Sequence, residues 1–126
     1  MCDDLPVTAT VLVVDDHPSF RSFARRLLQA AGFSVVDEAG DAASALAAVR
    51  ELRPDVVLLD VLLPDMTGFE LAEVLAADPN APIVVLTSSR SASDLGGSLE
   101  RSSARGFIAK SDLTTAALAA LVSEAA

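Results

Sequence analysis

The sequence predicts an α/β domain in which a five-stranded parallel sheet is covered by helices on both faces. Segments of strand type and segments of helical periodicity alternate along the whole chain. The strand segments are apolar without interruption, as is typical of strands that are buried on both faces. A helix after each strand indicates parallel crossovers, because each helix returns the chain to the edge where the previous strand began.

In the first half of the chain, turn and capping residues mark the ends of the elements. A helical stripe begins at Phe20 and is closed by Gly32. Asp41 is a suitable N-cap for a second helix, and Pro54 lies beyond its end. The most apolar strand runs directly into Asp60. The elements predicted here are a strand at 11–14, a helix at 20–31, a strand at 33–36, a helix at 42–49 and a strand at 56–59.

The second half repeats this alternation with one weak element. The elements predicted here are a helix at 68–77, a strand at 83–86, a helix at 91–102, a strand at 107–109 and a helix at 112–124. The helix at 91–102 contains Gly96 and Gly97, and each glycine costs up to about 1 kcal/mol relative to alanine inside a helix. We therefore predict that this helix is only marginally ordered.

Length and charge narrow the classes of function. The 126 residues predict one domain over 1–126, with residues 1–9 as an N-terminal tail. A formal net charge of −9 disfavours direct binding to nucleic acid or to an anionic membrane surface. The single Cys2 excludes an internal disulfide and a Cys-based zinc site, and the sequence shows no signal peptide and no membrane span. We therefore expect a soluble, cytoplasmic protein.

Four of the five predicted strands end on a polar residue of definite chemistry. Asp15 and Asp16 follow the first strand, Asp60 the third, Thr87 the fourth and Lys110 the fifth. The carboxyl ends of parallel strands share one edge of an open sheet, where ligands bind. We therefore expect these side chains to converge on one pocket.

The residue types in this pocket indicate phosphoryl chemistry. Three carboxylates held together repel one another, and a hard cation such as Mg²⁺, with Mn²⁺ as an alternative, relieves that repulsion. The Thr87 hydroxyl and the Lys110 ammonium are then available to an anion, for which a phosphoryl group is the best candidate. Asp60 follows the most apolar strand and is the predicted nucleophile, whereas the adjacent pair Asp15 and Asp16 suits metal binding.

Sequence motifs at these strand ends resemble those of a known family. The motifs are Val13-Val14-Asp15-Asp16, Asp60-Val61-Leu62-Leu63-Pro64-Asp65-Met66-Thr67-Gly68, Leu86-Thr87-Ser88 and Gly106-Phe107-Ile108-Ala109-Lys110. In this order they resemble the receiver domain of two-component response regulators, over essentially the whole chain. The resemblance implies a flavodoxin-like, CheY-like (βα)5 three-layer sandwich with strand order 2-1-3-4-5.

The resemblance also implies the role of each acidic residue. Asp60 would accept a phosphoryl group from a histidine kinase or a phosphotransfer protein. Asp16 would bind Mg²⁺ directly, Asp15 would bind it through water, and the main-chain carbonyl of Leu62 would complete the protein ligands.

The remaining motif residues would serve as phosphoryl ligands and as a switch. Thr87 and Lys110 would bind the phosphoryl oxygens, and Phe107 would rotate inward when Thr87 moves. The resemblance thus implies a regulatory phosphoacceptor that loses its phosphoryl group by hydrolysis, rather than a turnover enzyme. The resemblance implies a downstream protein or output domain as partner, and small residues of the last helix would allow a phosphorylation-dependent homodimer.

The sequences of two segments resemble most closely those of the receiver subfamily of NarL and LuxR type. They are Asp15-Asp16-His17-Pro18 and Lys110-Ser111-Asp112-Leu113, the latter with Ser111 where many receivers carry a proline. Members of that subfamily carry a helix-turn-helix output domain, and we expect none within these residues. His17 and the arginines of the first helix (Arg21, Arg25 and Arg26) are interpreted as solvated surface residues.

Two other functions remain as alternatives. A phosphate-independent interaction module on the same fold would make Asp60, Thr87 and Lys110 dispensable. A phosphohydrolase with an aspartyl nucleophile would need an acid two residues after Asp60, where the chain has Leu62. Leu62 is also expected to hinder attacking water, which predicts a long phosphoryl lifetime.

Overall fold

The computed structural model describes residues 9–123 and confirms the parallel sheet. Its five strands lie in the order β2-β1-β3-β4-β5, as the resemblance implied, and every neighbouring pair is parallel. The strands are β1 (Thr10–Val14), β2 (Ser34–Ala39), β3 (Val56–Asp60), β4 (Ile83–Ser88) and β5 (Gly106–Ala109). The predicted tail at 1–9 falls outside the described residues except for Ala9.

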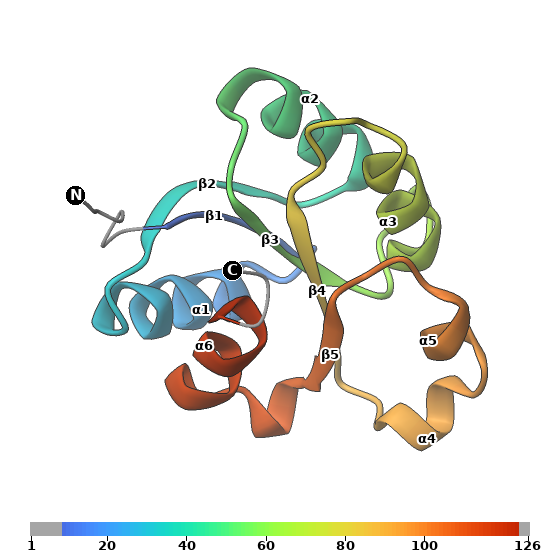
Figure 1. Ribbon diagram of the computed structural model, residues 1–126. Helices are drawn as coiled ribbons and strands as arrows, with labels where there is room; N and C mark the ends of the chain where they lie inside the picture. The colour runs from blue at the N-terminus through green and yellow to red at the C-terminus, as the bar shows by residue number, and fades with distance from the viewer. Residues whose placement is uncertain (1–8, 124–126) are drawn as a thin grey trace.

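Helices cover both faces of this sheet (Figure 1), which gives the three predicted layers. α1 and α6 lie on one face, whereas α2 and α3 lie on the other. The helices are α1 (Pro18–Ala30), α2 (Ala42–Leu52), α3 (Gly68–Ala76), α4 (Ala92–Leu95), α5 (Ser98–Arg101) and α6 (Thr115–Ser123), with a 3-10 turn η1 (Lys110–Asp112) before α6. Within residues 9–123, no helix combines the length and the apolarity that a membrane span requires.

Alternate residues of the central strands fill two separate cores. On β1, Val11 and Val13 pack toward α1 and α6, whereas Leu12 and Val14 pack toward α2 and α3. β3 is buried over its full length, which explains why its sequence is continuously apolar. This packing fixes the carboxyl ends of β1, β3 and β4 against one another.

Two of the predicted boundaries differ from the structure by three residues each. β2 continues from the predicted end at residue 36 to Ala39, because this edge strand stays paired with β1 through the polar residues Asp37 and Glu38. The last helix begins at Thr115 rather than at residue 112, because the chain first forms the turn η1.

The predicted fourth helix is interrupted. Residues 91–102 contain two four-residue helices, α4 and α5, separated at Gly96 and Gly97. Gly96 has φ 61° and ψ −147°, a backbone conformation that is essentially restricted to glycine and that ends α4. The single helix predicted at 91–102 is therefore wrong, because the two glycines divide it, and the marginal order of the segment stays a prediction.

Candidate functional site

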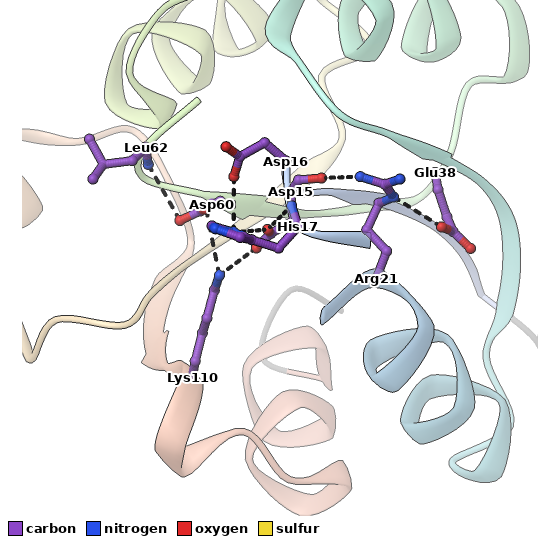
Figure 2. Close-up of polar contacts among 8 residues, drawn as sticks. All are labelled: Asp15, Asp16, His17, Arg21, Glu38, Asp60, Leu62 and Lys110. Carbon is purple, nitrogen blue, oxygen red and sulfur yellow. Dashed lines mark hydrogen bonds and ion pairs between the residues drawn. The ribbon is translucent and has the colours of Figure 1, made fainter. Parts of the chain in front are cut away.

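The carboxyl edge of the sheet brings together the predicted site residues Asp15, Asp16, Asp60 and Lys110 (Figure 2). Asp15 follows β1, Asp60 ends β3 and Thr87 lies near the end of β4, opposite Asp60 in the β3–β4 register. All three are buried, and Asp60 exposes 5% of its surface. Carboxylates are seldom buried unless they are paired, so this arrangement indicates a site and not a turn.

Lys110 reaches into the site from the turn that follows β5. Its Nζ atom lies 2.6 Å from Asp15 Oδ2 and 3.6 Å from Asp60 Oδ2. The same ammonium lies 4.3 Å from the centre of the Phe20 ring, on α1. The cation thus offsets part of the charge of the two buried carboxylates, and the ring shields one of its sides.

Four side chains could together hold a metal ion. Asp15, Asp16, His17 and Asp60 each offer a ligand atom, and these atoms lie within 4.8 Å of one another. A set of three carboxylates fits a hard divalent cation such as Mg²⁺, which prefers oxygen ligands. His17 is exposed, as predicted, but sequence reasoning missed that its ring contacts both neighbouring aspartates.

The acidity of Asp60 is strongly perturbed. Burial raises the pKa of this carboxyl to about 6, and the nearby charge of Asp15 adds to the increase. Lys110 and a 3.4 Å hydrogen bond from the Leu62 amide act in the opposite direction. A divalent cation would favour the ionised form further, which is the form that can attack phosphorus.

Thr87 and Phe107 occupy neighbouring strands. Within residues 9–123, the buried Thr87 hydroxyl oxygen has no hydrogen-bond partner, an arrangement that a bound oxyanion would satisfy. Phe107 lies opposite Leu86, one register position before Thr87, and is half-buried against the α2–α3 core. An unpaired hydroxyl and a half-buried aromatic ring suit the predicted switch, and the switch role of Thr87 and Phe107 stays a prediction.

The loop after Asp60 is held by short-range contacts. Leu62 is 59% exposed and pairs with Thr67, whose side chain caps α3 together with Glu70. A Cβ atom on Gly68 would lie 2.2 Å from the Asp60 carbonyl oxygen, so only glycine fits there. The role of the Leu62 carbonyl as a metal ligand stays a prediction.

Sequence reasoning missed two supports of the site. Arg21 donates to the Asp15 carbonyl at 2.6 Å and pairs with Glu38 at 3.1 Å, and so is not a merely solvated residue. Asp65 accepts hydrogen bonds from the first two amides of α2, those of Ala42 and Ala43. Both contacts join residues that are more than five positions apart, and no local pattern signals them.

Comparison with known proteins agrees with this geometry. The response regulator receiver domain family matches residues 11–122. The DNA-binding response regulator MtrA of Mycolicibacterium smegmatis is 47% identical over 90 residues, which are 71% of this chain and 39% of MtrA. The chain therefore spans well under half the length of that relative.

Solved structures are similar over nearly the whole chain. A LuxR-family two-component response regulator from Aurantimonas has a TM-score of 0.82 at 31% identity, over 93% of this chain and 86% of its own. The receiver domain of the putative response regulator NarL from Mycobacterium tuberculosis has a TM-score of 0.76 at 32% identity, over 92% and 98% of the two chains. The chain belongs to the response regulator receiver domain family of two-component systems.

Proposed function

We propose that this chain works as a phosphorylation-operated switch in which Asp60 is the phosphoacceptor. The observation that carries this proposal is the burial of Asp60 between a second carboxylate, Asp15, and the only lysine of the chain. A buried carboxylate with nearby cations is suited to nucleophilic attack on phosphorus.

The phosphoryl donor is a histidine kinase or a phosphotransfer protein, as for other receivers. An oxygen of the Asp60 carboxylate forms the new P–O bond while the P–N bond of the donor phosphohistidine breaks. The donor nitrogen keeps the electron pair and takes up a proton from solvent. Lys110 and Thr87 bind the phosphoryl oxygens in the product, where Thr87 gains the partner that its hydroxyl lacks.

Asp15, Asp16 and Asp60 would hold Mg²⁺, with Mn²⁺ as an alternative. When bound, the ion supplies charge neutralisation at the carboxylates and at the incoming phosphoryl group. The Leu62 carbonyl is the proposed main-chain ligand, as the resemblance to receiver domains implies. The residues of the chain supply the other functions of the site. Lys110 orients the phosphoryl oxygens, and the burial of the strand ends limits the access of water to Asp60.

Phosphorylation would change the surface formed by α4, α5, β5 and α6. Movement of Thr87 toward the phosphoryl group vacates space that the Phe107 ring can enter. Phe107 also lines an open groove with Ala109, Ala117 and Leu121. We propose that this groove accepts a downstream protein or a second phosphorylated copy of this chain. We also propose that this binding takes place in the cytoplasm.

The partner of this chain is a protein, not nucleic acid. The net charge of −9 opposes direct contact with DNA. MtrA is a DNA-binding response regulator, but the matched residues are 39% of its length. We therefore propose that the partner is a protein. On the resemblance to receiver domains, we also propose that the chain is a regulatory domain without its own turnover activity.

Intact mass tests the central step. The protein is incubated with Mg²⁺ and acetyl phosphate beside an Asp60→Asn control. We expect one added phosphoryl group in the wild type, and none in the control or without a divalent cation. A well-folded protein that gains no phosphoryl group would indicate the phosphate-independent module, and steady release of phosphate from phosphomonoesters would indicate a phosphohydrolase.

A further inference from the structure

We propose that His17 is a direct ligand of the metal site and makes it favour transition-metal cations such as Mn²⁺ and Co²⁺ over Mg²⁺. This inference takes from the proposed function only the location of the metal at Asp15, Asp16 and Asp60. It concerns which cation the site selects, and it does not depend on whether Asp60 is phosphorylated.

The position of the His17 ring matches the spacing of ligand atoms around a metal. Its Nδ1 atom lies 3.1 Å from Asp15 Oδ1 and 3.0 Å from Asp16 Oδ1. In an octahedral site with metal–ligand distances of about 2.1 Å, neighbouring ligand atoms are about 3.0 Å apart. The imidazole nitrogen therefore lies at ligand spacing from one carboxylate oxygen of each aspartate, where one ion could contact all three side chains.

The backbone around His17 presents the ring to this site. His17 is the N-cap of α1 with φ −101° and ψ 110°, and Pro18 restricts it to such an extended conformation. Its side chain makes no capping hydrogen bond to α1. The His17 amide donates to Asp15 Oδ1 at 2.9 Å, which ties the residue to the acidic pair.

The ligand atoms determine which metal ion the site prefers. Three carboxylates alone suit Mg²⁺, whereas an imidazole nitrogen adds affinity for first-row transition metals and very little for Mg²⁺. The ring is 67% exposed, so it can turn toward an ion without disturbing the core. His17 is accordingly a residue that determines metal specificity.

Calorimetric titration of the full chain with Mg²⁺, Mn²⁺ and Co²⁺ tests this assignment. For His17→Ala we expect the affinity for Mn²⁺ and Co²⁺ to fall by about tenfold or more, and that for Mg²⁺ to change by less than about twofold. His17→Asn is the matched polar control and should behave like His17→Ala. Asp60→Asn should weaken all three cations, which locates the binding at this site.

Electron spin echo measurements on the Mn²⁺-loaded chain give an independent readout. The chain contains one histidine, so a directly bound imidazole nitrogen can come only from His17. We expect nitrogen modulation in the wild type that is absent in His17→Ala.

The inference is overturned if His17→Ala leaves the ratio of Mn²⁺ to Mg²⁺ affinity unchanged and the wild type shows no nitrogen modulation. If the ring only hydrogen-bonds to the two aspartates, its removal would strengthen all three cations alike, which also contradicts the proposal. Failure of phosphorylation in the mass experiment, with the His17 effects intact, would instead contradict the proposed function.

Discussion

Among single residues, the site combines buried polar side chains, which lower the stability of the fold, with residues that compensate for their burial. Asp15, Asp60 and Thr87 are polar and buried, and Thr87 has an unpaired hydroxyl within the described chain. Lys110 offsets the two carboxylates, while Gly68 allows the chain to pass close to the Asp60 carbonyl. Each of these residues can be tested by a single substitution.

Leu62 is predicted to limit the access of water to a phosphorylated Asp60. Its side chain is apolar and 59% exposed, and its amide faces the Asp60 carboxylate. We expect Leu62→Asn to speed the loss of the phosphoryl group by about tenfold, because an amide side chain can orient an attacking water. The rate is measured by intact mass after removal of the phosphodonor.

Leu62→Met is the matched control for that experiment. It keeps an apolar side chain of similar size and should leave the rate unchanged. An unchanged rate in Leu62→Asn as well would show that Leu62 does not control the lifetime.

Gly68 is expected to tolerate no side chain. A Cβ atom there would meet the Asp60 carbonyl oxygen at 2.2 Å and the Val61 Cα at 2.9 Å, both of which are backbone atoms. We expect Gly68→Ala to lower the free energy of unfolding by about 3 kcal/mol or more, as measured by urea denaturation. Gly97→Ala, whose Cβ meets only the end of the flexible Arg101 side chain, should change it by less than about 1 kcal/mol. Equal effects of the two substitutions would contradict this view.

At the scale of elements, several long-range polar contacts tie loops to helices. Asp65, in the loop after Asp60, accepts from the first amides of α2, and Glu73 of α3 accepts both from the Ser103 amide and from its hydroxyl at 2.7 Å. The Ser103 hydrogen bonds lower the pKa of Glu73 below its usual value. The interrupted segment α4–α5 is thus anchored at its far end.

This anchor predicts the dynamics of the segment. We expect Glu73→Ala to increase amide hydrogen exchange at Ser103 and through α5 by roughly three- to tenfold, because the Ser103 amide loses its acceptor. Glu73→Gln, which keeps one oxygen acceptor, should show a smaller increase. The weak helix predicted at 91–102 is also expected to be mobile in the unphosphorylated protein. The same experiment checks this expectation, and slow exchange across the segment in the wild type would count against it.

The elements also show what the sequence can and cannot predict. The order of strands and helices and the residues at the strand ends followed from apolar runs and from the family motifs, because these are local patterns. The extension of β2 through Asp37 and Glu38 did not, since pairing with β1 overrides their polar character. The contacts of Arg21, Asp65 and Glu73 could not be predicted, because they depend on which loops the fold brings together.

For the molecule as a whole, the acidic site should lower the free energy of unfolding, and metal binding should raise it again. The chain carries a net charge of −9, and three of its carboxylates lie within one small cluster. A cation that binds only the folded state stabilises it by about 2.7 kcal/mol at a concentration 100 times its dissociation constant. Stability in the absence of divalent cations is therefore expected to depend on whether Asp60 is ionised.

Replacement of Asp60 by its neutral isostere should stabilise the metal-free protein at neutral pH. The pKa of Asp60 is about 6 in the folded protein against 3.8 for a free side chain, so the folded state binds the proton more tightly. This contribution to stability is present below about pH 4 and is lost as the pH rises through about 6. Asp60→Asn avoids the loss, and we expect it to be more stable than the wild type by about 1 to 3 kcal/mol at pH 7.

Urea denaturation at about pH 4.5 and about pH 7, without divalent cations, measures this difference. The advantage of Asp60→Asn should be small at the lower pH and large at the higher one, and added Mg²⁺ should reduce it because the wild type binds the ion more tightly. A stability advantage of Asp60→Asn that does not change between the two pH values would mean that packing around residue 60, and not its charge, causes the difference. A pH-dependent advantage would instead show that the ionised Asp60 carboxylate destabilises the metal-free fold. A bound metal ion would offset this destabilisation.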